Sequence, residues 1–228
     1  MFAQVTNGRE TWRPRATVPR HRHDRAYAAL VLSGGYEECG SRGRFRVGPG
    51  DVLLHGAFDA HLDRFDNRET VILDLKLPRR IPFALGSIAD VDAAVRLAEK
   101  DAKAAGAYVC DRIVEKNAPP RDWRDALADV LLSEPSARLD AWAQEHRLSA
   151  ETLSRGFGHT FGVTPATFRA EARAHRAYAL IAGTAMPLCA IAADAGFADQ
   201  PHMTRAVKAL TGQAPQFWRR SNPFKTAA

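Results

Sequence analysis

The spacing of hydrophobic and polar positions changes near residue 88 and divides the chain into two parts. Before this point, short apolar runs such as AALVL (28–32), DVLL (51–54) and TVILDLKL (70–77) alternate with glycine-containing turns. Intervals of about 8 to 12 residues between such runs are typical of an antiparallel sandwich or small barrel. We therefore predict a β domain over residues 1–87.

Residues 88–135 carry helical patterns. The stretch VDAAVRLAEKDAKAAGAYVCDRIVEK (91–116) is rich in Ala, Lys and Glu and has no proline, which indicates one or two helices. Apolar residues then recur at helical spacing over 123–131. We predict a helical linker over 88–135 and the main domain boundary near Pro135. Its apolar positions would either pair two subunits into a homodimer or pack against the β domain.

The pattern over residues 136–228 is helical throughout and contains a weak internal repeat. A short apolar helix, a turn and a helix with a polar face occur at 139–161 and again at 188–210. The stretch between them, PATFRAEARAHRAYALIAG (165–183), predicts a helix about 28 Å long at 1.5 Å per residue. Two recognition helices on one side of DNA lie about 34 Å apart. A rigid helix of this length, with its turns, can hold two helix-turn-helix units at that spacing.

Each unit has a polar face that could read DNA. The apolar stripe of the second helix in each unit leaves polar residues outside, and these are Glu151, Ser154, Arg155 and His159 in the first unit and Gln200, His202, Thr204, Arg205 and Lys208 in the second. Arg and Gln side chains read guanine and adenine edges in the major groove. On the connecting helix, Arg169, Arg173 and Arg176 form a stripe suited to phosphate contact. A solvated amphipathic helix is the alternative for each of these faces.

Charge and composition narrow the class of protein. The net charge is +6 with a pI near 9.5, and +5 of this surplus lies in residues 136–228, which favours an anionic partner there. The 46% hydrophobic and 25% charged residues exclude disordered, collagen and coiled-coil classes. Three widely spaced cysteines suggest neither a disulfide framework nor a cysteine zinc site, and no apolar run approaches a bilayer span. We expect a cytoplasmic protein without a membrane partner.

The stretches AETLSRGFGHTFGVTPATF (150–168) and PLCAIAADAGFADQPHMTRAVKALTGQAPQFWR (187–219) carry a resemblance. Residues from about 138 to 220 resemble the DNA-binding domain of the AraC/XylS family of bacterial transcription regulators. The resemblance implies two helix-turn-helix units that read successive major-groove segments of an asymmetric site, with RNA polymerase as a partner and activation as the commoner mode. The residues that match the family's DNA-contacting positions, together with the adjacent His202, are Glu151, Ser154, Arg155, Gln200, Pro201, Thr204 and Arg205.

Two residues of the first unit depart from the family's pattern. Gly156 stands in a helix interior where the family usually has a basic or longer residue, at a cost of about 1 kcal/mol in helix propensity. Glu151 is an acid on the reading face, where it could accept from a cytosine amino group but would repel phosphate. The first unit is therefore expected to contribute less affinity than the second.

Histidines mark the β domain. On a strand, residues i and i+2 point to the same side, so His21 and His23 would share a face, and His61 is expected to approach them in a small barrel. His55, at the end of an apolar run, is predicted to be structural. Residues 20–75, with the H-x-H unit, VGPGDVLL and a later histidine, resemble the two motifs of the cupin barrel.

The cupin resemblance implies that His21, His23 and His61 are metal ligands. Tyr27 stands where metal-binding cupins usually have a glutamate. Three imidazoles with an open fourth position suit zinc, nickel, copper or iron. The alternative is that these histidines are satisfied by hydrogen bonds or line a pocket for a small organic molecule.

The sequence therefore predicts a multidomain α+β protein with a cupin-like antiparallel β-barrel, a helical linker and an all-α domain (136–228) with two helix-turn-helix units. Its predicted function is a transcription regulator, not an enzyme, whose barrel senses a small molecule or metal and which binds double-stranded DNA. The first alternative is a metal-dependent cupin enzyme with an accessory helical domain, and the second is an architectural DNA-binding protein without a ligand.

Overall fold

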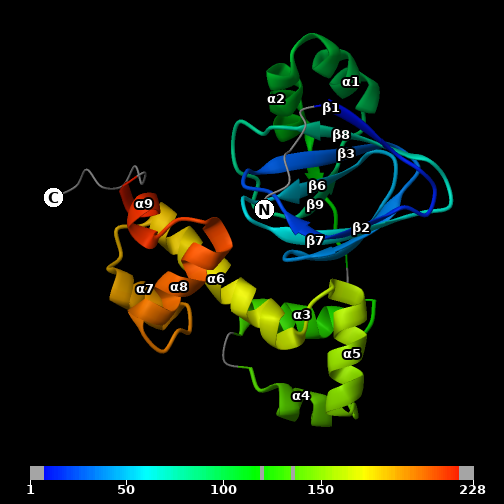
Figure 1. Cartoon of the computed structure of the whole chain (residues 1–228). Coiled ribbons are helices and arrows are strands. Elements are labelled where there is room, and N and C mark those ends of the chain that lie inside the picture. The colour runs from blue at the N-terminus through cyan, green and yellow to red at the C-terminus, as the bar shows by residue number, and fades with distance from the viewer. Residues whose placement is uncertain (1–7, 119–120, 135–136, 221–228) are drawn as a thin grey trace. The chain divides into compact units, whose positions relative to one another are not determined.

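The computed structural model describes residues 8–118, 121–134 and 137–220 (Figure 1). The chain divides into two compact units, residues 1–120 and 121–228. The predicted linker over 88–135 is not a unit of its own, because its first two helices belong to the first unit and its third helix to the second. The predicted boundary near Pro135 lies outside the described residues.

The first unit, here called the β unit, contains the described strands in two antiparallel sheets. The larger sheet has the strand order β1-β8-β3-β6-β9-β10 and the smaller one β2-β7-β4-β5. The strands are β1 (Gly8–Trp12), β2 (Thr17–Arg22), β3 (Tyr27–Ser33), β4 (Tyr36–Gly40), β5 (Gly43–Val47), β6 (Asp51–His55), β7 (Ala60–Phe65), β8 (Thr70–Leu75), β9 (Leu85–Ser87) and β10 (Val114–Glu115). The antiparallel β domain predicted from turn spacing is confirmed.

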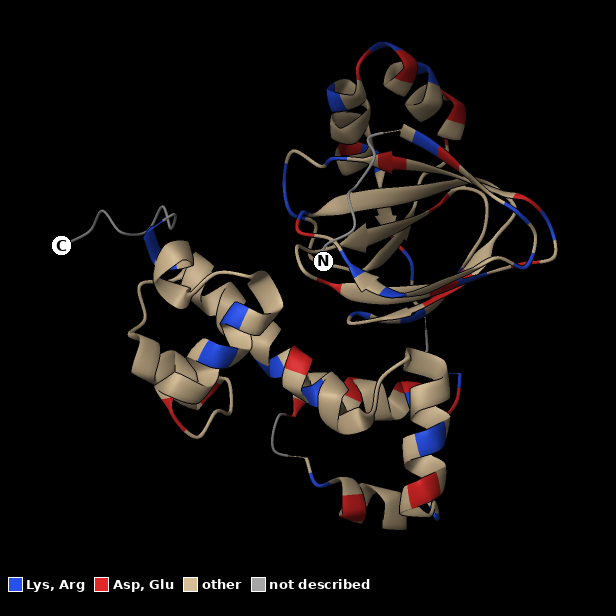
Figure 2. Cartoon of the chain, in the orientation of Figure 1, with Lys and Arg blue, Asp and Glu red and all other residues tan. Residues whose placement is uncertain are grey.

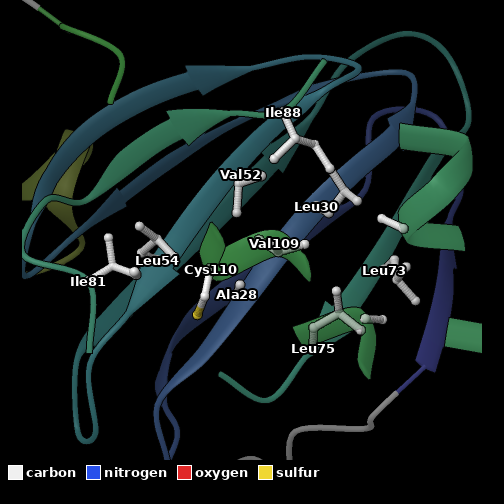
Figure 3. Close-up of a cluster of buried hydrophobic side chains, with 12 residues drawn as sticks. Ala28, Leu30, Val52, Leu54, Leu73, Leu75, Ile81, Ile88, Val109 and Cys110 are labelled. Carbon is white, nitrogen blue, oxygen red and sulfur yellow. The ribbon is translucent and has the colours of Figure 1, made fainter. Parts of the chain in front are cut away.

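Strand β3 lies in the middle of the larger sheet and is buried on both faces. Ala28 and Leu30 belong to one hydrophobic cluster, shown in Figure 3, whereas Tyr27, Ala29 and Val31 belong to another. Successive side chains of a strand point to opposite faces, so a doubly buried strand has a continuous apolar sequence. This explains why AALVL shows no alternation.

Two helices, α1 (Val91–Lys100) and α2 (Ala102–Arg112), cover one face of the larger sheet. The carboxylates of Asp90 and Asp101 cap them by accepting from backbone N–H groups of the first turns. Their buried residues, which include Val109 and Cys110, join the cluster that contains Leu30 and Leu75 (Figure 3). Packing against the sheet thus accounts for the apolar positions of these helices.

The second unit, here called the helical unit, is helical in its described residues. Its helices are α3 (Trp123–Ser133), α4 (Leu139–Glu145), α5 (Ala150–Phe161), α6 (Pro165–Gly183), α7 (Leu188–Asp194), α8 (Gln200–Thr211) and α9 (Pro215–Arg220). Ser149, Thr164 and Asp199 cap α5, α6 and α8 through their side-chain oxygens. Gly162 and Gly212 end α5 and α8 in the left-handed conformation, with φ of 72° and 76°.

Helix α6 is a 19-residue helix between two small cores. At its beginning, Phe168 packs with Phe157 and Phe161 of α5, at ring centroid distances of 5.3 Å. At its end, Ala177 and Ile181 share a cluster with α7 and α8. The predicted repeat of two helix-turn-helix units joined by one long helix is confirmed. None of the helices in the described part of the chain has the length and apolar character that a bilayer-spanning segment needs.

Candidate functional site

The two predicted reading helices are α5 and α8, and the structure exposes the residues predicted on them. In α5, Glu151, Ser154 and Arg155 are exposed, whereas the opposite side, with Leu153 and Phe157, is buried. In α8 the exposed residues are Gln200, Pro201, His202 and Arg205, and Thr204 is half-buried. Both sets lie in the N-terminal half of their helix, which is the part of a recognition helix that contacts bases.

The two reading faces differ in charge. Arg155 donates to the carboxylate of Glu151, so the two charges of α5 neutralise each other. In the described part of the chain, Arg205 has no ion pair, and Lys208 follows it in the last turn of α8. Figure 2 shows Lys and Arg on α5, α6 and α8, and an acidic residue on each of α5 and α6 but none on α8. The expected asymmetry between the two units is consistent with this arrangement.

The arginine stripe of α6 is partly engaged within the protein. Arg169 donates to the carbonyl oxygen of Ala137 at 2.8 Å, and Arg176 pairs with Asp194 at 2.9 Å. Burial, with a smaller effect from Arg169, lowers the pKa of Arg173. Phosphate contact by Arg169 and Arg173 therefore stays a prediction, and Arg169 also holds the segment that precedes α4 against α6.

The β unit contains a cavity of about 440 Å³. Its lining combines aromatic, histidine, carboxyl and guanidinium side chains from both sheets, and these include Trp12, Arg20, His21, His23, Tyr27, Tyr36, Glu38, His55, His61, Asp63, Phe65 and Asp74. A cavity of this size with a few convergent polar groups is typical of a small-molecule site.

The cavity brings the three predicted histidines together. His21 of β2 lies opposite His61 of β7 in the strand pairing. The Nε2 atoms of His21 and His23 are 3.1 Å apart, and the Nδ1 atom of His21 lies 3.0 Å from the carbonyl oxygen of Pro19. Ligand atoms of all three histidines lie within 4.8 Å of one another. The residues therefore fit a divalent metal, with His21 oriented by a backbone carbonyl as ligating histidines usually are.

A second set of three ligands shares His61 with the first. Glu38, His55 and His61 also place ligand atoms within 4.8 Å of one another, and all three are buried. The Nε2 atom of His55 lies 3.5 Å from Oε2 of Glu38, and the ring of His55 stacks on Tyr27 at 4.3 Å. The prediction of His55 as structural did not anticipate its place in this cavity.

Burial shifts the titration of the cavity's ionisable groups. It lowers the pKa of His55 to about 3, and it lowers that of His61 as well. It raises the pKa of Asp63 to about 7 and that of Asp74 to about 8, where the charges of Glu10 and Asp63 add to the effect. Burial, together with the charge of Asp63, also raises the pKa of Glu38. His55 and His61 are thus neutral at pH 7, the form in which imidazole binds a metal.

A model of a helix-turn-helix domain matches residues 142–221. The helical unit therefore contains an AraC-type helix-turn-helix domain. A comparison with curated proteins found no match.

Several solved structures resemble the chain. Unsaturated-fatty-acid-bound ToxT from Vibrio cholerae is 11% identical over 95% of both chains, with a TM-score of 0.45. The C-terminal domain of AraT, a response regulator from Geobacillus stearothermophilus, is 20% identical over 46% of this chain and 89% of its own, with a TM-score of 0.42. The DNA-binding domain of AdpA, in complex with target DNA, is 18% identical over 44% of this chain and 92% of its own, with a TM-score of 0.41.

The packing of α3 against α5 explains why a glycine, Gly156, stands in the interior of α5. A Cβ at Gly156 would lie 2.8 Å from Cζ2 of Trp123, and the carbonyl oxygen of Gly156 accepts from Nε of Arg124 at 3.2 Å. The glycine therefore lets α3 pack against α5. This helix precedes the matched residues, so the helical unit extends beyond the AraC-type domain at its N-terminal end.

Proposed function

We propose that this protein is a transcription regulator that binds DNA through its AraC-type domain and a small effector in the cavity of the β unit. The observation that carries the proposal is the pair of exposed polar faces on α5 and α8, within the matched domain, on either side of the 19-residue helix α6. A helix of this length spans about 28 Å, close to one turn of DNA.

DNA recognition would divide between the two reading helices and α6. We expect Arg205 and Gln200 to bind base edges in one major-groove segment, and Arg155 to read the adjacent one after it leaves Glu151. Arg169 and Arg173 would contact phosphates and fix the register of the domain on the duplex. Ser154, Pro201, His202 and Thr204 complete the predicted contact surface.

The β unit would act as the sensor. Its cavity combines aromatic walls with carboxyl and imidazole groups, which suits a small polar effector or a divalent metal such as zinc, nickel or iron. The effector can change DNA binding only if it binds two arrangements of the protein with unequal affinity. We further propose a homodimer, since two linked domains raise the effective affinity for paired sites, and RNA polymerase as the partner in activation.

The alternative function is a metal-dependent enzyme of the β unit. The cavity's histidines and carboxyl groups favour it, whereas the AraC-type domain favours the regulator. An enzyme would form product in the absence of DNA. A sensor would change its DNA affinity without forming product.

Selection of binding sequences from a random duplex library, followed by anisotropy titrations of the full-length protein, tests DNA binding. We expect an asymmetric site that spans two major-groove segments, and an affinity that falls with salt by about 0.9 log units per log unit of salt for each neutralised phosphate. No enriched sequence, or a slope near zero, would contradict the proposal.

A further inference from the structure

The two ligand sets in the cavity compete for one ion because both use His61. The first, with His21 and His23, consists of three neutral imidazoles, and the second replaces two of these with Glu38 and His55. Which set holds a metal determines where an effector would meet it. The inference below rests on the proposed sensor function of this cavity.

Charge favours the second set. A dication in a buried site is costly unless anionic groups compensate it. Three imidazoles supply no negative charge to a bound dication. Glu38 supplies one negative charge directly. Asp63, whose Oδ2 lies 3.9 Å from Nε2 of His61, supplies a second one next to the ion.

The distance between two of these ligand atoms also fits a metal site. Two ligand atoms about 2.1 Å from a tetrahedral metal are separated by about 3.4 Å. The Oε2 atom of Glu38 and the Nε2 atom of His55 are 3.5 Å apart. The strand pairing brings the carboxylates together, because Glu38 of β4 lies directly opposite Asp63 of β7. Two like charges at such a position destabilise a sheet. Either a proton on one carboxyl group or a cation between the two relieves this repulsion.

Two of the buried side-chain atoms that lack a hydrogen-bond partner among the described residues lie on β7. These are Nδ1 of His61 and Oδ1 of Asp63, and both side chains line the cavity at 4% and 7% residue exposure. Buried polar atoms of this kind are rare, and a bound water or ion is one of the explanations for them. They lie on β7, next to both carboxylate and imidazole ligands.

We propose that Glu38, His55 and His61 hold a divalent transition metal, with the carboxylate of Asp63 compensating its second charge. Two histidines and one carboxylate are a known donor set for zinc and for ferrous iron. Three protein ligands leave a coordination position for water or for an oxygen or nitrogen atom of the effector. Glu38 thus replaces the carboxylate that the sequence lacks at Tyr27.

Zinc and cobalt(II) chloride are the probes. The full-length protein, purified without a histidine tag and stripped with chelator, is titrated with zinc in competition with a chromophoric chelator. His55→Ala and His23→Ala form a matched pair, because both remove an imidazole that is 7% or 8% exposed. We expect wild type and His23→Ala to bind one equivalent of zinc each. His55→Ala should bind zinc at least ten-fold more weakly, because the loss of a residue that only supports a ligand already costs about that much.

Glu38→Gln tests the same site with a variant that is expected to fold. The amide keeps the size of the side chain and removes a charge that burial opposes, so the variant should fold at least as well as wild type by circular dichroism. It should bind zinc at least ten-fold more weakly. The visible absorption of the cobalt-loaded protein should change in this variant and stay unchanged in His23→Ala.

Loss of zinc in His23→Ala with retention in Glu38→Gln would overturn the assignment in favour of the three-histidine set. No zinc binding by the wild type would overturn it as well, and so would equal losses in all variants. DNA selection is independent of these titrations. An empty cavity would leave the regulator intact, whereas the absence of a DNA site would not affect the metal assignment.

Discussion

The β unit and the helical unit place their charged groups in opposite ways. The β unit buries Glu38, His55, His61, Asp63 and Asp74 around its cavity. Among the described residues of the helical unit, the buried ionisable side chains are limited to Asp125, and its reading residues are exposed. This difference matches the two kinds of ligand that we propose, a small one enclosed within the β unit and a polyanion on the surface of the helical unit.

Each arrangement has its energetic consequence. Buried carboxyl groups destabilise the β unit when they ionise, so a cationic ligand gains affinity from them. Exposed arginines cost little in the free protein and release counterions when they meet phosphate. Changes in the cavity should therefore alter stability with pH, whereas changes on α5 and α8 should alter DNA affinity.

The largest effect is expected from Asp74→Asn. In the folded protein the pKa of Asp74 is raised to about 8, so this group binds its proton more tightly than in the unfolded chain. Its contribution to the free energy of unfolding is present at acid pH and is lost as the pH rises from about 4 to 8. Since one pKa unit corresponds to about 1.4 kcal/mol, the variant should be a few kcal/mol more stable than wild type at pH 8.5. Hydrogen exchange in β3 measures this stability.

Two controls accompany this measurement. Glu69→Gln neutralises an exposed carboxylate between β7 and β8 and should leave the pH dependence unchanged. Exchange in α6 should not respond to Asp74→Asn. Equal stability of the variant and wild type at pH 8.5 would show that burial of Asp74 carries no such cost.

The next effect is on DNA affinity. Arg205→Ala should weaken binding to the selected site by about 1 to 3 kcal/mol and relax specificity at one position. Arg155→Ala should cost less, because Arg155 must first leave Glu151. Anisotropy titrations at one salt concentration compare the two variants. Equal losses would refute the asymmetry between the reading helices.

Two glycines of α5 give a smaller, opposite pair of effects. A Cβ at Gly156 meets Trp123 at 2.8 Å, whereas a Cβ at Gly158 meets the carbonyl oxygen of Val163 at 3.8 Å, an ordinary contact. Gly158→Ala should stabilise the helical unit by up to about 1 kcal/mol through helix propensity. Gly156→Ala should destabilise it by about 1 kcal/mol, since overpacking outweighs that gain. Urea unfolding followed by circular dichroism measures both, and stabilisation by both substitutions would contradict the packing of α3 on α5.

The smallest effect is expected from Glu151→Gln. The variant loses an exposed ion pair between residues four apart on α5, which is worth about 0.3 to 0.5 kcal/mol of stability. Its DNA affinity should rise, because a negative charge leaves the reading face and frees Arg155. The same anisotropy titration shows the change. A loss of affinity would indicate that Glu151 itself accepts from a base.

The sequence predicted the elements better than the cavity. Apolar spacing and turn residues located the strands, α6 and both reading helices, because these features depend on neighbours in the chain. The polar cavity residues depend on strand register instead. Glu38 faces Asp63 and Tyr27 faces His55 only through strand pairing, which no local pattern specifies. Alternation did offer one signal, since His61, Asp63 and Phe65 occupy every second position of β7.

The place of α3 was missed for a related reason. Its apolar stripe predicted a helix but not the unit to which that helix belongs. The signal lay on α5, where Gly156 lowers helix propensity without an apparent local reason. A glycine in a helix interior often marks a close approach by another element, and here that element is Trp123.

The unbroken helix α6 also limits how this protein can change over generations. Each residue added to an α-helix turns everything beyond it by about 100° and advances it by about 1.5 Å. One inserted residue in α6 would therefore rotate α8 out of phase with α5, although neither reading face had mutated. Insertions or deletions near a whole number of turns would restore the phase and shift the spacing of the two DNA segments in steps of about 5.4 Å.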